Sequence, residues 1–137
     1  MKRQSATILI IDTHGRALAV SRGTNTRDLG MPGGWVEPGE TGEQAAAREL
    51  WEETGLWVEP GDLEPIYQQG GCTTFTTRPG GTIRGDADPA HPDRLILEPK
   101  GSHWEGYPGF VPIADLARPS STFWKSNLRM LRDLGLL

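Results

Sequence analysis

The sequence predicts an α/β domain of the α+β type that occupies residues 1–137 as a single unit. Three observations lead to this prediction. Short segments rich in β-branched residues recur on both sides of one strongly marked helix, and a second helical pattern closes the chain. A length of 137 residues suits one domain with a single hydrophobic core. We therefore expect strands that pack against two helices.

The first half of the domain begins with two segments that have strand character. Residues 6–12 are apolar and β-branched, residues 13–16 form a turn, and residues 17–21 are predicted to return as the partner strand of a hairpin. Residues 22–30 are polar and are predicted to form a loop. Arg22 and Arg27 lie in that loop, where an arginine is either a contact for a substrate phosphate or an ordinary surface side chain.

The helix predicted over residues 42–54 has clear signals at both ends. Thr41 and Gln44 form a capping-box pattern before the first turn, and Gly55 stands where a left-handed residue ends a helix. One face of this helix carries Glu49, Glu52 and Glu53. The other face, which we expect to be buried, carries Ala47, Leu50, Trp51 and Thr54.

The second half of the chain is predicted to complete the sheet and add the last helix. Strands are expected over residues 63–68, 72–78 and 109–112, with shorter ones over 82–84 and 94–97, a loop over 85–93 and a helical turn over 113–117. Ser121 or Thr122 is expected to cap a final helix that runs to about residue 134. Its predicted apolar stripe is Phe123, Leu128, Leu131 and Leu134.

Composition excludes several classes of function. The chain is 36% hydrophobic, its mean hydropathy is −0.47, and no apolar run approaches the ~20 residues that span a membrane. The basic N-terminus lacks a signal-peptide pattern. A net charge of −4 without a basic stripe argues against a nucleic-acid polymer as partner. The single cysteine, Cys72, fits the reducing cytoplasm. We expect a cytoplasmic protein without membrane contact and leave a homodimer open.

Glu49, Glu52 and Glu53 are the first candidates for a functional site. At helical spacing they share an arc of roughly 100° on one face, where like charges repel. Such a cluster is either a solvated acidic face or a set of ligands for a hard divalent cation, because Mg²⁺ and Ca²⁺ prefer carboxylate oxygen. The glycine-rich turn at residues 32–34, which precedes the helix, favours the cation.

The same stretch resembles the signature of a known family. Its order is Gly34, five residues, Glu40, seven residues, Arg48-Glu49-Leu50, one residue, Glu52-Glu53, one residue, Gly55-Leu56. This order resembles the box of the Nudix hydrolase family (MutT-like), and the resemblance is strong over residues 29–56. It implies an α/β/α sandwich with a mixed β-sheet, with the box helix packed on the sheet and a helix at the C-terminus.

The resemblance also implies a reaction and its residues. It implies Mg²⁺-dependent hydrolysis of a phosphoanhydride bond in a nucleoside diphosphate linked to another moiety, X, with Mn²⁺ as a substitute cation. Glu49, Glu52, Glu53 and a backbone carbonyl near Gly33 are implied as metal ligands, and Arg48 is implied to orient a glutamate. The general base is Glu52 or Glu53, or a glutamate outside the box. The outside candidates are Glu98 and Glu105, of which we prefer Glu105.

The partner predicted by this reasoning is a small nucleotide. Arg22, Arg27 and Trp35 are our candidates for contacts with it, and each has a purely structural alternative. The alternative function is a noncatalytic nucleotide-sensing module of the same fold. Such modules usually lose glutamates of the box, and Glu49, Glu52 and Glu53 are all present here, which favours the enzyme.

Overall fold

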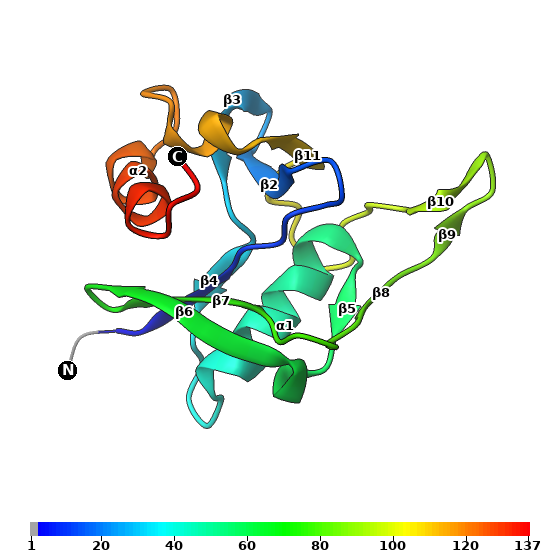
Figure 1. Cartoon of the computed structure of the whole chain (residues 1–137). Coiled ribbons are helices and arrows are strands. Elements are labelled where there is room, and N and C mark those ends of the chain that lie inside the picture. Colours follow the sequence, from blue (N-terminus) through cyan, green and yellow to red (C-terminus); the bar gives the residue numbers. More distant parts are fainter. Residues whose placement is uncertain (1–2) are drawn as a thin grey trace.

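The computed structural model describes residues 3–137 (Figure 1). Its elements are β1 (Ser5–Ile8), β2 (Arg16–Arg22), β3 (Asn25–Gly30), β4 (Gly33–Trp35), α1 (Gly42–Thr54), β5 (Trp57–Val58), η1 (Pro60–Asp62), β6 (Leu63–Gln69), β7 (Cys72–Thr77), β8 (Ile83–Arg84), β9 (Ala87–Asp88), β10 (His91–Leu95), β11 (Pro108–Pro112), η2 (Ile113–Ala117) and α2 (Trp124–Asp133). The two helices, the mixed sheet and the strands between them confirm the predicted fold class.

A mixed four-stranded sheet supports α1. Its order is β4-β1-β7-β6, in which β1 runs antiparallel to β4 and parallel to β7. Helix α1 lies against β1, β4 and β7. The core between them includes Ile8, Ala46, Leu50 and Phe75, each at most 3% exposed. This packing fixes the helix relative to the glycine-rich strand β4.

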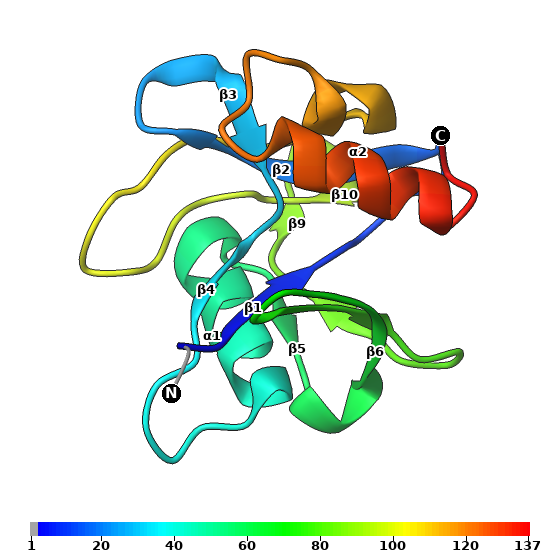
Figure 2. The same cartoon turned by 90° about the vertical axis from the view of Figure 1, so that its left-hand side faces the viewer.

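A second, antiparallel sheet has the order β11-β2-β3. Together with η2 and α2 it encloses a separate core. The buried residues of that core include Leu9, Ala19, Leu116 and Leu131. Figure 2 shows α2 lying across β2, while α1 lies with β1 and β4 below it. Each of these two sheets therefore has its own helix and its own hydrophobic core.

The predicted hairpin between residues 6–12 and 17–21 is wrong. Strand β1 ends at Ile8 and pairs with β4 and β7, whereas β2 pairs with β3 and β11. Only the tip is hairpin-like, where the Leu18 N–H donates to the Ile10 carbonyl at 2.9 Å. The sequence after residue 6 stays apolar because the chain passes here from the first core to the second. Ile8 is buried in the first core and Leu9 in the second.

Two segments predicted as loops form strands. Residues 22–30 contain β3, and residues 85–93 contain most of a β9–β10 hairpin that projects from the molecule (Figure 1). All five residues of β10 are exposed. A strand that faces water on both sides carries no hydrophobic alternation, so the polar sequence did not reveal it.

Helix α1 has the predicted bounds and caps, whereas α2 ends close to the predicted residue 134 but lacks the predicted cap. The Thr41–Gln44 capping box and the left-handed Gly55 are both present at α1. Helix α2 starts at Trp124 without a side-chain cap, because the Thr122 hydroxyl donates to Asp28 instead. Phe123 is 60% exposed and lies outside the buried face, which is formed by Asn127, Met130 and Leu131. Between residues 3 and 137 no helix combines the length and apolar character needed to cross a membrane.

Candidate active site

Helix α1 presents its acidic face to a cavity of about 270 Å³. The opposite side of the helix is fixed in the core, and the Thr54 hydroxyl donates to the Leu50 carbonyl at 2.6 Å. The residues that line the cavity are Val20, Glu37, Arg48, Glu49, Glu52, Glu53, Pro99, Gly101, Ser102, His103, Glu105 and Gly106. The cavity therefore collects carboxylates from the helix and from the loop that precedes β11.

Three carboxylates converge in this cavity. Glu49, Glu53 and Glu105 each offer one oxygen within 4.8 Å of the others. Glu53 is only 8% exposed, and its Oε1 accepts the Gly33 N–H at 3.0 Å. Burial raises the pKa of Glu53 to about 9, with further contributions from its hydrogen bond with Glu49 and from the charges of Glu49 and Glu105. Burial also raises the pKa of Glu49. Burial and the neighbouring carboxylates thus disfavour ionisation of Glu53 and Glu49, and the protein surroundings do not fully compensate the charge of their ionised forms.

Arg48 supplies positive charge to one side of the cluster. Its Nε and Nη2 donate to the two carboxylate oxygens of Glu40 at 2.8 and 2.9 Å. Its Nη1 donates to Glu49 at 3.0 Å and to Glu52 at 3.4 Å, and Nη2 also reaches the Trp35 carbonyl. These bonds hold the pKa of Glu40 below its usual value. Arg48 therefore orients Glu49 and Glu52, while Glu53 receives its hydrogen bond from the backbone.

The glycines of β4 allow the backbone to approach these carboxylates closely. A Cβ on Gly34 would lie 2.5 Å from Oε1 of Glu49, and a Cβ on Gly33 would lie 2.4 Å from the Ala6 carbonyl oxygen. A side chain at position 33 would have to displace the backbone of β1, and one at position 34 would have to displace the Glu49 carboxylate. The backbone of β4 therefore lies directly against the Glu49 carboxylate and β1.

The other predicted glutamates have different places. Glu52 lines the cavity at its rim, with a side chain 36% exposed, and lies outside the group of three converging oxygens. Glu98 points away: its side chain is 64% exposed and pairs with Lys100 at 3.3 Å. Between the two candidates outside the box, the fold brings only Glu105 to the cluster.

A second cavity, of about 390 Å³, continues from the first. Glu53 and Glu105 line both cavities, so they stand where the two meet. The remaining lining residues are Val20, Ser21, Arg22, Asp28, Leu29, Gly30, Met31, Thr122 and Phe123. This cavity offers an apolar wall with charged groups at its edge, which suits a ligand with a flat apolar ring and polar substituents.

Asp28 and Thr122 close one side of this second cavity. Asp28 accepts hydrogen bonds from the Thr122 N–H and hydroxyl, both at 2.7 Å, and these bonds lower its pKa. Arg22 approaches the same hydroxyl with its Nη1 at 3.4 Å. The contact joins β3 to the segment before α2, 94 residues apart in the chain.

Arg27 and Trp35 lie away from both cavities. Arg27 lines a separate surface hollow with Arg118 and Ser120. The Trp35 ring is 49% exposed, and the Arg3 guanidinium stacks 4.4 Å from its centroid. The fold therefore brings Arg22, but not Arg27 or Trp35, to the cavities that contain the carboxylates.

Sequence reasoning missed several residues of the two cavities. Ser102 and His103 line the first, and their closeness to Glu105 in the sequence was a usable signal. Asp28, Thr122 and Phe123 line the second, and no local pattern marks them as residues of a site. They meet only because β3 and the start of α2 are neighbours in the fold.

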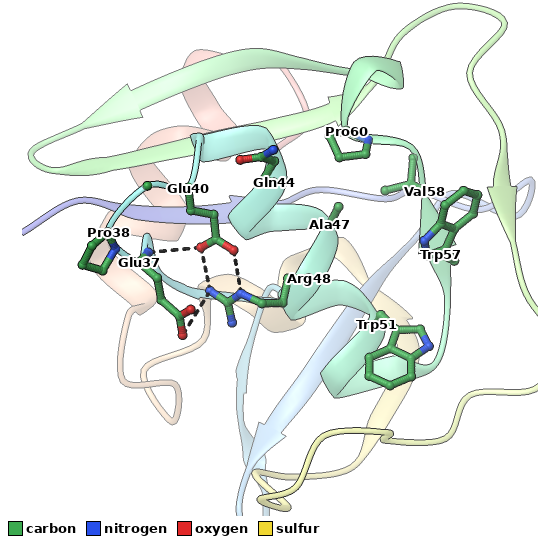
Figure 3. Close-up of a pocket in the computed structure, with 11 residues that line it drawn as sticks. Glu37, Pro38, Glu40, Gln44, Ala47, Arg48, Trp51, Trp57, Val58 and Pro60 are labelled. Atoms are coloured by element: carbon green, nitrogen blue, oxygen red, sulfur yellow. Dashed lines mark hydrogen bonds and ion pairs between the residues drawn. The ribbon is translucent and has the colours of Figure 1, made fainter.

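A groove of about 660 Å³ runs along another side of α1 (Figure 3). Trp51 and Trp57 lie at one end, and the ion pairs of Arg48 with Glu40 and Glu37 lie at the other. The predicted burial of Trp51 is wrong, because its side chain is 43% exposed. The sheet covers only the Ala46 and Leu50 side of the helix, and β5 leaves Trp51 on the wall of an open groove.

The family follows from a comparison of the whole chain with known proteins. The NUDIX domain model matches residues 1–133. The chain belongs to the Nudix family. The match extends far beyond residues 29–56, on which the sequence resemblance rested, and it includes both of these sheets and all of α2.

Relatives of this Nudix chain align over less than half of their own length. A MutT-like protein of Streptomyces ambofaciens is 44% identical over 61 residues, which are 44% of this chain and 38% of that protein. Phosphatase NudJ of Escherichia coli K12 is 42% identical over 60 residues, which are 43% of this chain and 39% of that protein. An RNA pyrophosphohydrolase of Erythrobacter litoralis is 39% identical over 64 residues, which are 44% of this chain and 38% of that protein.

Solved structures resemble the Nudix chain along its whole length. A MutT NUDIX hydrolase from Burkholderia pseudomallei superimposes with a TM-score of 0.62 at 19% identity, over 94% of this chain and 97% of the other. A MutT structure described from Aliivibrio salmonicida and Vibrio cholerae gives 0.62 at 21% identity, over 97% and 99%. At these identities the likeness establishes the fold.

Proposed function

We propose that this protein hydrolyses a phosphoanhydride bond in a nucleoside diphosphate linked to a moiety X, and that the reaction depends on Mg²⁺. The observation that carries the proposal is the convergence of Glu49, Glu53 and Glu105 within 4.8 Å of one another in a cavity. Membership of the Nudix family and relatives named as a pyrophosphohydrolase and a phosphatase support it.

The carboxylate cluster fits a hard divalent cation. Glu49 and Glu53 are partly or largely buried, and burial raises the pKa of both, so their charges lack a full complement of protein partners. Carboxylate oxygens are the ligands that Mg²⁺ prefers, and Mn²⁺ accepts the same donors. When bound, the cation supplies neutralisation of phosphate charge and a lower pKa for water at the site.

We assign distinct roles to the residues of the cluster. Glu49 and Glu53 hold the cation from α1, and Glu52 at the rim and the backbone carbonyl of Gly33 complete its surroundings. Arg48 keeps Glu49 and Glu52 in place through its hydrogen bonds. Glu105 approaches from the loop and accepts a proton from the attacking water, as a general base. The oxygen of that water then bonds to phosphorus, and the bridging oxygen leaves with the departing phosphate.

The two cavities suggest how a nucleotide lies in the site. Phosphates occupy the cavity that contains the glutamates, and the nucleoside occupies the second cavity, between Leu29, Met31 and Phe123. Arg22 at the edge of that cavity then pairs with a phosphate or polar group of the ligand. The names of the relatives point to several kinds of substrate, so X stays general. We place the reaction in the cytoplasm, in line with the single cysteine.

A substrate screen tests the proposal directly. Purified protein is incubated with nucleoside triphosphates, nucleotide sugars, ADP-ribose and dinucleoside polyphosphates, with Mg²⁺ or with EDTA, and release of phosphate and pyrophosphate is measured. We expect at least one class to be hydrolysed with Mg²⁺ and none with EDTA. Binding of nucleotides without hydrolysis of any of them would contradict the proposal and favour the nucleotide-sensing module.

A further inference from the structure

Glu105 belongs to a stretch that is almost entirely exposed. Residues 102–105 and Tyr107 are exposed, and the one buried residue among them is Gly106. A glutamate on such a stretch does not gain a fixed position from its own side chain contacts. Something else must hold its backbone if its carboxylate is to meet Glu49 and Glu53.

The end of β2 holds the backbone on both sides of Gly106. The Gly23 N–H donates to the Glu105 carbonyl at 2.6 Å, and the Ser21 N–H donates to the Tyr107 carbonyl at 3.0 Å. The Ser21 hydroxyl adds two bonds, because it donates to the Gly23 carbonyl and accepts the Tyr107 N–H, each at 2.8 Å. Ser21 is 4% exposed, so its hydroxyl has few alternatives in water.

Gly106 allows the two backbones to touch. A Cβ at this position would lie 1.7 Å from the Ser21 carbonyl oxygen and 2.9 Å from the Ser21 hydroxyl oxygen. Any side chain would therefore push the stretch away from β2. The hydrogen bonds of the Ser21 hydroxyl and the absence of a side chain at Gly106 therefore stabilise the same contact between β2 and this stretch.

We propose that Ser21 and Gly106 are positioning residues that set the place of the Glu105 carboxylate where the two cavities meet. The inference rests on the proposed function, in which Glu105 acts as the base, and goes beyond it by naming what fixes the base. Ser21 contacts the backbone beside Glu105 and acts through it. Ser21 also lines the second cavity, so separate measurement of kcat and KM distinguishes displacement of Glu105 from a loss of ligand binding.

A double-mutant cycle separates this role from general support of the fold. We expect Ser21→Ala to lower kcat about 10-fold, the range found when a supporting hydrogen bond is removed, with KM changed less than about 2-fold. In the Glu105→Gln background the same substitution should cause no further loss, because the group it positions is gone. Equal losses in both backgrounds would overturn the proposal. Thr76→Ala, which removes a hydroxyl bond to the Leu9 carbonyl away from both cavities, is the matched control.

Affinity for Mn²⁺ gives a readout that does not require turnover. An oxygen of Glu105 lies within 4.8 Å of those of Glu49 and Glu53, so its charge contributes to the attraction of a cation. Titration with Mn²⁺, followed by the electron paramagnetic resonance of the free ion, should show about 10-fold weaker binding for Ser21→Ala and for Glu105→Gln, and no additional weakening in the double variant. Gly106→Ala should weaken binding at least as much.

The outcomes distinguish the two proposals. If the wild type hydrolyses no nucleotide but Ser21→Ala weakens Mn²⁺ binding through Glu105, the positioning role stands and the proposed function fails. If the wild type hydrolyses nucleotides but Ser21→Ala is additive with Glu105→Gln in kcat and in Mn²⁺ affinity, the positioning role fails alone. A wild type that neither hydrolyses nucleotides nor binds Mn²⁺ contradicts both. Because Gly106→Ala can disturb folding, the results for Ser21→Ala decide whether the positioning role is correct.

Discussion

Helix α1 and the stretch over residues 98–107 deliver carboxylates to the same cluster by different means. Glu49 and Glu53 come from a capped helix whose other side is buried against β1 and β7, so local signals and core packing place them. Glu105 comes from an exposed stretch and is held by contacts with β2, more than 80 residues earlier in the chain. Signals that lie close together in the sequence place Glu49 and Glu53, whereas a contact that forms only in the folded chain places Glu105.

The largest expected effect concerns the glutamates themselves. Glu53→Gln should lower Mg²⁺-dependent kcat by about 10³-fold or more, because it removes a buried ligand charge, and Glu105→Gln by about 10²-fold, as expected for loss of a base. Glu98→Gln is the matched control and should leave kcat unchanged, since Glu98 is exposed and pairs with Lys100. Circular dichroism checks that each variant is folded.

The relative losses of kcat in these variants test whether the helix or the loop contributes more to the reaction. A larger loss for Glu105→Gln than for Glu53→Gln would show that the loop, and not the helix, dominates the chemistry. Near-normal turnover of Glu53→Gln would contradict the assignment of the cation to α1. An effect of Glu98→Gln equal to that of Glu105→Gln would place the base elsewhere.

The second prediction concerns the approach of β4 to α1. Gly34→Ala places a methyl group 2.5 Å from the Oε1 position of Glu49, so the carboxylate must move. We expect kcat to fall about 10²-fold, the loss that a displacement of about 1 Å in a reacting group causes. Gly109→Ala is the control, because a Cβ there meets no atom within 4 Å. Equal activities for the two variants would show that the fit of Gly34 against Glu49 is not needed.

The sequence predicted the helix side of the site far better than the loop side. The capping box, Gly55 and the spacing of Glu49 and Glu53 are local, and the structure has the helix and caps where they were predicted. Local signals failed where a contact depends on distant segments. Ser21 and Asp28 carry no pattern of their own, and Thr122 was marked only as a cap of the last helix. Their roles arise from contacts across 86 and 94 residues. Trp51 was misjudged for a related reason, since a helical wheel does not show how far the sheet extends.

The third prediction is a pH dependence of stability in the cation-free protein. The pKa of Glu53 is raised from 4.5 to about 9 in the folded state, so folding binds a proton between these values. The free energy of unfolding should therefore fall as the pH rises from about 5 to about 9, and Tm with it. Mg²⁺ requires the ionised carboxylate, so the increase in Tm that it causes should grow over the same range.

Differential scanning fluorimetry at pH 6 and pH 8.5 measures both trends. Each kcal/mol corresponds to about 4 °C for a domain of this size. Glu53→Gln should flatten the pH dependence and remove most of the Mg²⁺ effect, whereas Glu98→Gln should leave both as they are. A cation-free wild type whose Tm rises with pH over this range would contradict the burial of Glu53 as the cause.

The smallest expected effect separates helix stability from loop positioning. Thr41→Ala removes the side-chain acceptor of the Gln44 N–H and should lower the free energy of unfolding by about 1 kcal/mol. It should leave kcat near the wild-type value below Tm, because the core still holds α1 against the sheet. Ser21→Ala should differ from it in kcat, which falls clearly, although removing the two hydrogen bonds of this buried hydroxyl also lowers the free energy of unfolding by about 1–3 kcal/mol. A Thr41→Ala protein that stays folded yet loses as much activity as Ser21→Ala would contradict this separation. It would show that the positions of Glu49 and Glu53 depend on the helix cap as strongly as the position of Glu105 depends on β2.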